Sequence, residues 1–407
     1  MPDDARAHGP AMAFETRLSQ LGRPAKRAGK GTVNVPLIRA STVTFPDCAT
    51  LRDARLRRLD QYGSYGIHGL ATHHALEDVV AEIEGGDRAA IQGSGLAAIV
   101  VAMMAYLKAG DHCLMPDSCY GPTRNLCDTL LAGFGVETTY YDPCIDEAGI
   151  AKLIRDNTRV VYTESPGSHS FEVQDVPAIS RAAHARGAKV LMDNTWGIHH
   201  FQPFRHGVDV SIQALTKYVV GHSDVLLGSV TVKNAEWPAI KNAQVTLGQY
   251  ASADDVWLAL RGSRTLPVRL ARQAESAMTV ARWLEGRPEV LRVLHPALES
   301  HPQHALWKRD FSGSCSLFGV VFQPRYTMDQ VNRLIDGLDL FAIGASWGGY
   351  ESLVLPTTGT LTRVATSADL GGPAMRLHIG QEDPRDLIAD LGAGIAALDT
   401  PFTALED

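Results

Sequence analysis

The chain has 407 residues, of which 45% are hydrophobic and 20% charged, and its net charge is −7. A chain of this length and composition predicts a globular protein with more than one domain, because it is too long for a single small core. The acidic balance argues against a nucleic-acid partner, since nucleic-acid-binding domains are usually basic. The longest nearly uniform apolar run, residues 96–107, is too short to cross a membrane, so no membrane partner is expected.

The start of the chain and its cysteines predict a cytoplasmic protein. The first residues lack the apolar core of a secretory signal. The six cysteines form no C-x-x-C pair and are expected to be reduced, mostly buried thiols. Neither the cysteines nor the histidine pairs His73-His74 and His199-His200 have the spacing of zinc ligands, so no metal site is predicted.

Predicted strands and helices alternate over the first two thirds of the chain. An arm of about 35 residues is expected to be loosely ordered or to pack on a neighbouring subunit. A Gly/Tyr loop follows over residues 60–71, and Thr72 is expected to cap a helix that ends at Glu84. Strands are then expected, with helices between most of them, at residues 89–92, 112–115, 136–141, 159–163, 189–192, 209–214 and 228–232. This alternation predicts an α/β protein with a mostly parallel, doubly wound sheet.

The composition changes near Arg261, which predicts a second and smaller α/β domain. A long amphipathic helix is expected from Arg261 to about Glu285, and shorter strand and helix patterns follow it. Two loops in this part contain chemically active side chains, residues 346–352 and 376–380.

Polar, aromatic and glycine residues gather where the predicted strands of the large sheet end: Gly95, Tyr120, Ser165, Asp193, Thr216 and Lys217. Ligands of such sheets bind at the carboxyl ends of the strands, so these residues predict one site. Gly95 and Leu96 lie between a strand and a helix, where backbone N–H groups can bind a phosphate. The pattern is neither a Walker loop nor the dinucleotide fingerprint G-x-G-x-x-G.

Asp193 and Lys217 follow two buried strands and suggest a site for a cationic ring and a carbonyl. Burial lowers the pKa of a lysine towards that of a nucleophilic amine, which can form a Schiff base. An aspartate beside a pyridinium nitrogen keeps that nitrogen protonated, so that the ring can accept electrons. From position alone, Lys217 could also be a surface lysine and Asp193 a helix cap. Tyr120 could stack on a planar cofactor or belong to the core.

Two residues of the second domain suggest substrate contacts. Arg376 interrupts an apolar strand pattern and therefore needs a fixed anion, either a substrate carboxylate or an internal salt-bridge partner. Trp347 lies between Ser346 and two glycines, which would let the backbone approach a ligand while the indole walls a pocket.

Together these residues resemble the pyridoxal-phosphate enzymes of cysteine and methionine metabolism, which have fold type I. The resemblance runs from about Asn34 to Gly394. It is carried by Tyr65-Gly66, Gly95-Leu96-Ala97-Ala98, Tyr120-Gly121-Pro122, and residues 164–168, 193–196, 211–218, 221–224, 346–352 and 376–380. It implies an N-terminal arm and intersubunit segment at residues 1–69, a PLP-binding domain at 70–262 and a C-terminal domain at 263–407.

The resemblance also implies roles for single residues and an assembly. Lys217 and Tyr120 would be catalytic: Lys217 would hold pyridoxal 5'-phosphate as a Schiff base and then move the Cα proton, and Tyr120 would stack on the ring. A homotetramer of two active dimers is implied. Asp193 would pair with the pyridine nitrogen. The Gly95 and Leu96 amides and Thr216 would hold the phosphate, and Tyr65 would reach in from the adjacent subunit. The substrate would be bound by Arg376, Ser346 and Trp347.

Two positions depart from the family pattern. The family usually has an arginine where this chain has Ile67, two residues after Tyr65, and that arginine contacts the phosphate across the dimer. His68 is a candidate replacement. Many relatives also have serine where this chain has Ala214. Losing one charge-assisted contact to the phosphate would cost about 1.5–3 kcal/mol if nothing replaces it.

Within the family, the motifs are most similar to those of bacterial enzymes that cleave L-cystathionine by β-elimination in methionine biosynthesis. The expected products are homocysteine, pyruvate and ammonia, and the choice of β-elimination rests mainly on Trp347, where γ-specific relatives generally have a smaller residue. The alternatives are a cystathionine γ-lyase or γ-synthase, a methionine γ-lyase type of activity, and a cysteine or cystine desulfhydrase. Two alternatives belong to other functional classes: a dinucleotide-dependent oxidoreductase and a non-catalytic binding protein. The oxidoreductase is disfavoured because the chain has no G-x-G-x-x-G motif.

Overall fold

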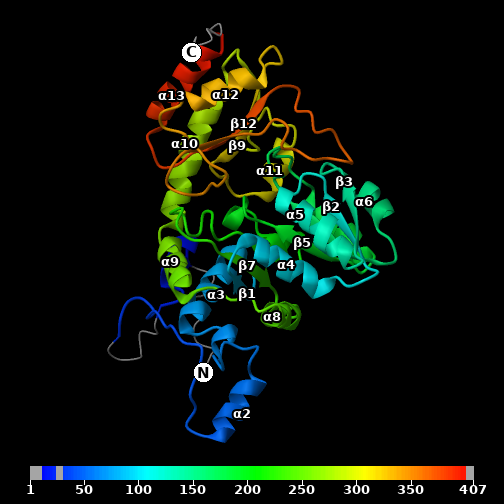
Figure 1. Ribbon diagram of the computed structural model, residues 1–407, viewed down its shortest axis with the longest axis vertical. Helices are drawn as coiled ribbons and strands as arrows, with labels where there is room; N and C mark the ends of the chain where they lie inside the picture. Colours follow the sequence, from blue (N-terminus) through cyan, green and yellow to red (C-terminus); the bar gives the residue numbers. More distant parts are fainter. Residues whose placement is uncertain (1–11, 24–30, 400–407) are drawn as a thin grey trace, which may run out of the picture.

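The computed structural model describes residues 12–23 and 31–399, which form two sheets flanked by helices (Figure 1). The larger sheet has seven strands in the order β1-β7-β6-β5-β4-β2-β3. Strands β3, β2, β4, β5 and β6 run parallel, and β7 is antiparallel to both β6 and β1. This confirms the mostly parallel α/β sheet. The strands are β1 (Arg88–Gln92), β2 (His112–Pro116), β3 (Glu137–Tyr141), β4 (Thr158–Glu164), β5 (Lys189–Asp193), β6 (Val210–Gln213) and β7 (Gly228–Val232).

The central strands β4, β5 and β6 are largely buried, because helices cover both faces of the sheet. In β5, Val190 and Met192 belong to the core on one face, whereas Leu191 belongs to the core on the other. The helices and helical turns of this part are α1 (Phe14–Gln20), α2 (Cys48–Leu56), η1 (Gly66–His68), α3 (Ala71–Glu84), α4 (Gly95–Tyr106), α5 (Gly121–Leu126), η2 (Cys127–Leu131), α6 (Glu147–Leu153), α7 (Val176–Ala185), η3 (Ile198–His200), η4 (Pro203–His206), α8 (Trp237–Thr246) and α9 (Ala253–Ser263).

The second sheet has five strands in the order β10-β11-β12-β9-β8, and only its β10–β11 pair is parallel. Helix α10 joins the two sheets, since Leu270 packs in the core of the larger sheet and Leu284 in that of the smaller (Figure 1). The elements are α10 (Leu266–Glu285), β8 (Val290–Leu294), α11 (His304–Asp310), β9 (Leu317–Phe322), α12 (Met328–Asp336), β10 (Ala342–Ile343), β11 (Leu353–Pro356), β12 (Ala374–His378), α13 (Pro384–Ala396) and η5 (Ala397–Asp399).

Two predicted helix starts are wrong. Thr72 is not the cap of α3, because the helix begins at Ala71 and the Thr72 hydroxyl donates to the Pro36 carbonyl at 2.9 Å. The long helix expected from Arg261 begins at Leu266 instead, after α9 has ended at Ser263. Pro267 explains this start, since proline has no N–H and fits only the first turn of a helix. The predicted domain boundary between residues 262 and 263 falls in the last turn of α9 and stays a prediction.

Part of the N-terminal arm is anchored to its own chain. Leu18 of α1 is 1% exposed, and its carbonyl accepts a hydrogen bond from Arg264. Arg17 forms an ion pair with Glu82 of α3 at 2.6 Å. This stretch is therefore not loosely ordered, whereas residues 1–11 and 24–30 of the expected arm lie outside the described residues.

The six cysteines are free thiols, and four of them are buried, as expected. No helix in the described ranges is both long and apolar enough to cross a membrane.

Candidate active site

The structure places Asp193 and Lys217 at the carboxyl end of the larger sheet. Asp193 ends β5, and its Oδ1 accepts hydrogen bonds from the backbone N–H of Thr195 at 3.0 Å and from the Thr195 hydroxyl at 2.6 Å. Lys217 follows β6, and its Nζ donates to Ser346 Oγ at 2.9 Å. Packing of the smaller sheet on the larger therefore brings Ser346 to the amine of Lys217.

The surroundings of Lys217 shift its amine towards the neutral form. Burial, together with the charge of Arg376, lowers the pKa of Lys217 to about 8, and the charge of Asp193 opposes the shift. The Trp347 ring centroid lies 5.4 Å from Nζ. The unprotonated fraction near neutral pH is a minority but far larger than for an ordinary lysine, and this fraction can act as a nucleophile or accept a proton.

A second carboxyl group lies beside Asp193. Glu164 ends β4 and is paired with Asp193 across the two strands. Burial raises the pKa of Glu164 to about 8, and the charge of Asp193 adds to this shift. Burial also raises the pKa of Asp193, whereas the two Thr195 donors lower it. Two adjacent buried carboxylates repel each other, so one of the pair holds a proton. We place the proton on Glu164 and the negative charge on Asp193, because the charge of Lys217 lowers the pKa of Asp193.

Glu164 was not given a role from the sequence. Its side chain contacts Tyr120, since Glu164 Oε2 accepts a hydrogen bond from the Tyr120 backbone N–H at 2.7 Å. The sequence signal available was a carboxyl residue that ends a buried apolar strand next to the strand of Asp193. Tyr120 precedes the first residue of α5, its side chain is half-exposed, and burial together with the charge of Asp193 raises its pKa.

The start of α4 forms a cradle that only glycine permits. A Cβ atom at Gly95 would lie 2.7 Å from the Cβ of Ala214, so the helix start packs directly against the segment before Lys217. Ser94 caps the helix and accepts from the Ala97 N–H at 3.1 Å. The first amides of a helix have no partner inside it and form a positive dipole end, so the Gly95 and Leu96 amides suit a phosphate.

Thr216 lies at this cradle, but its hydroxyl is already engaged. It donates to the Leu227 carbonyl at 3.1 Å and accepts from the Leu227 N–H at 2.9 Å. To donate to a phosphate it would have to turn away from the Leu227 carbonyl, so this predicted role remains open.

Arg376 lies in the middle of β12 and is 7% exposed. Its guanidinium donates to the backbone carbonyls of Ala345 at 3.1 Å and Ser346 at 3.0 Å. Among residues 12–23 and 31–399 it has no ion pair, so the internal salt bridge considered from the sequence is not found there. Burial lowers the pKa of Arg376 to about 10. A charged fork held by two carbonyls, with donors left over, suits an incoming carboxylate.

The glycine after Trp347 packs against the backbone of Lys217. Gly348 has φ +86°, and a Cβ atom there would lie 2.7 Å from the carbonyl carbon of Lys217. The close backbone approach expected from the sequence is therefore made to Lys217. The Trp347 ring packs edge-on against Tyr218 at a centroid distance of 5.3 Å.

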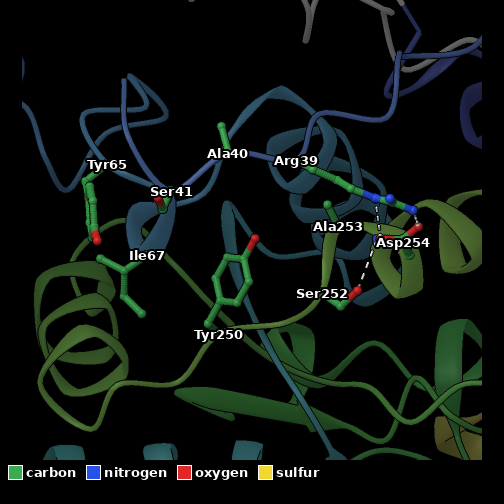
Figure 2. Close-up of a pocket in the computed structure, with 10 residues that line it drawn as sticks. Arg39, Ala40, Ser41, Tyr65, Ile67, Tyr250, Ser252, Ala253 and Asp254 are labelled. Carbon is green, nitrogen blue, oxygen red and sulfur yellow. Dashed lines mark hydrogen bonds and ion pairs between the residues drawn. The ribbon is translucent and has the colours of Figure 1, made fainter. Parts of the chain in front are cut away.

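Tyr65 does not join this group within one chain. It is 50% exposed and lines a separate cavity of about 630 Å³. Figure 2 shows Tyr65 and Ile67 at one side of this cavity, Tyr250 in the middle and the ion pair of Arg39 with Asp254 at the other side. Among the lining residues Arg39 is the only one with a cationic side chain, and it is paired.

His68 is held by its own loop, since its Nδ1 lies 2.7 Å from Ser64 Oγ. Burial lowers the pKa of His68, and Lys241 and Arg58 act in the same direction, which disfavours a positive charge on the ring within one chain. Its role in place of the usual arginine stays a prediction.

The family model of the Cys/Met metabolism PLP-dependent enzymes matches residues 15–396. The chain belongs to this family. Its cofactor is pyridoxal 5'-phosphate, and the residues described above fit that group. Lys217 offers an amine whose pKa is lowered towards neutrality, and Asp193 offers a carboxyl group at the strand ends that accepts from Thr195. Gly95 lets the start of α4 pack against Ala214, with its first amides available to a phosphate.

Similar members of the family are known from sequence and structure. The chain is 44% identical to the cystathionine beta-lyase of Bordetella avium, over 95% of this chain and 98% of that one. It is 40% identical to the cystathionine beta-lyase MetC of Escherichia coli, again over 95% and 98%. The crystal structure of cystathionine gamma-lyase from Lactobacillus plantarum in complex with L-serine superimposes with a TM-score of 0.85 at 28% identity, covering 95% of this chain and 99% of that one. The fold is thus that of the family, with fold type I architecture.

Proposed function

We propose that this protein cleaves the C–S bond of L-cystathionine by β-elimination and releases homocysteine, pyruvate and ammonia. The observation that carries the proposal is Trp347, whose ring centroid lies 5.4 Å from Lys217 Nζ, so that the indole borders the amine. The two relatives named for this activity, each similar over 95% of the chain, support the same choice. The substrate is thus a small sulfur amino acid.

The side chains divide the work between binding and proton transfer. When bound, pyridoxal 5'-phosphate supplies an electron sink for the charge that develops at Cα. Lys217 would hold the cofactor and, as a free amine, would take the Cα proton at Nζ. Arg376 would bind the α-carboxylate in two-point contact, and Ser346 orients the Lys217 amine through its 2.9 Å hydrogen bond. Asp193 would pair with the ring nitrogen of the cofactor.

The electron balance of the elimination requires no further oxidant or reductant. The Cα–H bond breaks and its proton goes to Lys217. The electron pair left at Cα forms the Cα–Cβ double bond as the Cβ–S bond breaks, and the pair of the Cβ–S bond leaves with sulfur. The thiolate then takes a proton and departs as homocysteine. Water hydrolyses the remaining aminoacrylate to pyruvate and ammonia.

The product of cystathionine cleavage tests this proposal. We expect the cofactor-loaded protein to form pyruvate and homocysteine in equal amounts. The bond broken joins sulfur to Cβ of the half of cystathionine whose α-carboxylate Arg376 binds. Formation of 2-oxobutyrate and cysteine instead would support the γ-lyase alternative, which the similarity to the Lactobacillus plantarum structure keeps in view. Parallel assays with cysteine and cystine measure the desulfhydrase alternative, and lower kcat/KM for these two substrates is expected.

The active form is proposed to be a dimer, with two dimers forming a homotetramer in the cytoplasm. Tyr65 is half-exposed, and no partner for its hydroxyl lies within the described ranges, so it is available to a second copy of the chain. The cavity that it lines would then border the partner's cofactor site. Because Ile67 is apolar, the phosphate would depend on Tyr65 and the start of the partner's α4 for its contacts.

Co-expressing two variants tests whether each active site takes Lys217 from one subunit and Tyr65 from the other. We expect Lys217→Ala and Tyr65→Ala to be weakly active alone but to regain activity when co-expressed. In a two-fold dimer of one copy of each, one site carries both changes and the other carries neither, so statistical mixing restores about a quarter of wild-type activity. Activity no higher than that of the separate variants would show that Tyr65 acts within its own chain or not at all.

A further inference from the structure

A buried carboxyl group at the end of α3 is bonded to the two strand ends that carry Asp193 and lead to Lys217. Glu84 is the last residue of α3 and is 0% exposed. Its carboxyl accepts hydrogen bonds from Gln213 Nε2 at 2.7 Å, from Asn194 Nδ2 at 3.0 Å and from the hydroxyl of Ser211. Ser211 and Gln213 belong to β6, which leads to Lys217, and Asn194 directly follows Asp193.

These contacts lie at the carboxyl end of the β5–β6 ladder. Its paired residues end with Asp193 and Ile212, and one further backbone hydrogen bond follows them, from the Asn194 N–H to the Ile212 carbonyl at 2.9 Å. Side chains add to the backbone bonds there. Gln213 Nε2 donates to the Asn194 carbonyl at 2.8 Å as well as to Glu84. Glu84 therefore adds side-chain bonds between the two segments at the point where their ladder ends.

The connection continues to the functional atoms. The Thr195 hydroxyl accepts from the Ala214 N–H at 2.9 Å and donates to Asp193 Oδ1 at 2.6 Å. The Lys217 N–H in turn donates to the Ala214 carbonyl at 3.1 Å. A shift of the segment that Glu84 holds would therefore move Asp193 and Lys217 relative to each other.

Stability alone does not account for Glu84. A buried carboxylate loses its hydration, and replacing buried ionic groups with apolar residues is often neutral or stabilising. Burial raises the pKa of Glu84 to about 7, and the charge of Asp193 acts in the same direction, whereas the three donors lower it. Burying this carboxyl group costs free energy, yet it accepts hydrogen bonds from three donors on two strand ends. We therefore attribute to it the relative position of those strand ends rather than the stability of the fold.

We propose that Glu84 is a positioning residue that holds Asp193 and Lys217 at the separation that the cofactor requires. The inference rests on the proposed roles of those two residues. It predicts that Glu84 acts on cofactor affinity and on the electronic state of the cofactor–lysine linkage, although it touches neither substrate nor cofactor.

The test compares Glu84→Ala and Glu84→Gln with Asp209→Asn. Asp209 is a matched control, because its carboxylate accepts from the Val190 N–H at 2.8 Å at the opposite end of the same two strands. Three quantities are measured on each purified protein: the melting temperature, the dissociation constant of pyridoxal 5'-phosphate from the apoprotein, and the pH midpoint of the absorbance of the lysine–cofactor linkage. None of them requires turnover.

We expect Glu84→Ala to raise the dissociation constant about tenfold or more, a change of ~1.4 kcal/mol, and to move the pH midpoint. Glu84→Gln should have a smaller effect, because it keeps the size of the side chain and one acceptor oxygen. Asp209→Asn should lower the melting temperature and leave the other two quantities unchanged.

The inference is overturned if the Glu84 variants lose thermal stability as the control does and leave the dissociation constant and the midpoint unchanged. Should Glu84→Ala fail to fold, Glu84→Gln and Ser211→Ala decide by the same criteria. Borohydride reduction of the wild-type protein separates this failure from failure of the proposed function. An adduct on Lys217 together with unaffected variants refutes only the role of Glu84, whereas no adduct on Lys217 refutes the assignment on which it rests.

Discussion

Lys217→Ala is expected to lower kcat for cystathionine by roughly 10²–10⁴-fold from the loss of proton transfer alone. The physical reason is the position of the amine, which donates to Ser346 at 2.9 Å and whose pKa burial lowers to about 8. Borohydride reduction of the wild-type protein followed by peptide mass measurement should find the pyridoxyl group on the Lys217 peptide. The variant should carry no adduct.

Lys241 is an internal control for that measurement. It is also buried, but its Nζ is paired with Glu77 at 3.5 Å, so it should stay unmodified in the same digest. A pyridoxyl adduct on Lys241, or full activity of Lys217→Ala, would show that the wrong lysine has been assigned.

Arg376→Leu is expected to reduce kcat/KM for cystathionine by roughly 30-fold to several thousand-fold. Removing one partner of a buried charge pair costs about 2–5 kcal/mol, and each ~1.4 kcal/mol is a factor of ten. Arg376→Lys should recover only part of this loss, because an ammonium keeps the charge but not the two-point geometry. Steady-state kinetics of the purified, cofactor-loaded variants measures both, and most of the change should appear in KM.

Arg269→Met is the matched control for this prediction. Arg269 is likewise buried, donates to the backbone carbonyls of Tyr218 and Gly262, and has its pKa lowered to about 10 by burial. Its removal should lower the melting temperature and leave KM near the wild-type value. Equal losses of kcat/KM in the Arg269 and Arg376 variants would mean that Arg376 supports the fold rather than the substrate.

Much of the site was predictable because its members occupy the ends of regular elements. A buried parallel strand is recognisable as a short apolar run, and the residue that follows it must lie at the carboxyl edge of the sheet. The sequence patterns therefore place Asp193, Lys217 and Gly95 on one edge of the sheet. The start of α10 was not predictable from the pattern. The amphipathic pattern continues through residues 261–265, although α9 ends at Ser263 and α10 begins only at Leu266, just before Pro267.

The sequence by itself determined the α/β class, the family and the strand-end residues, because short-range periodicity and contiguous motifs encode them. Only the tertiary structure decided which distant groups meet. Ser346 lies at Lys217 although 129 positions separate them. Glu164 faces Asp193 across two strands, and Glu84 reaches both β5 and β6 from α3. The physical reason is that such contacts depend on strand order and on the packing of one sheet against another, which local patterns do not specify.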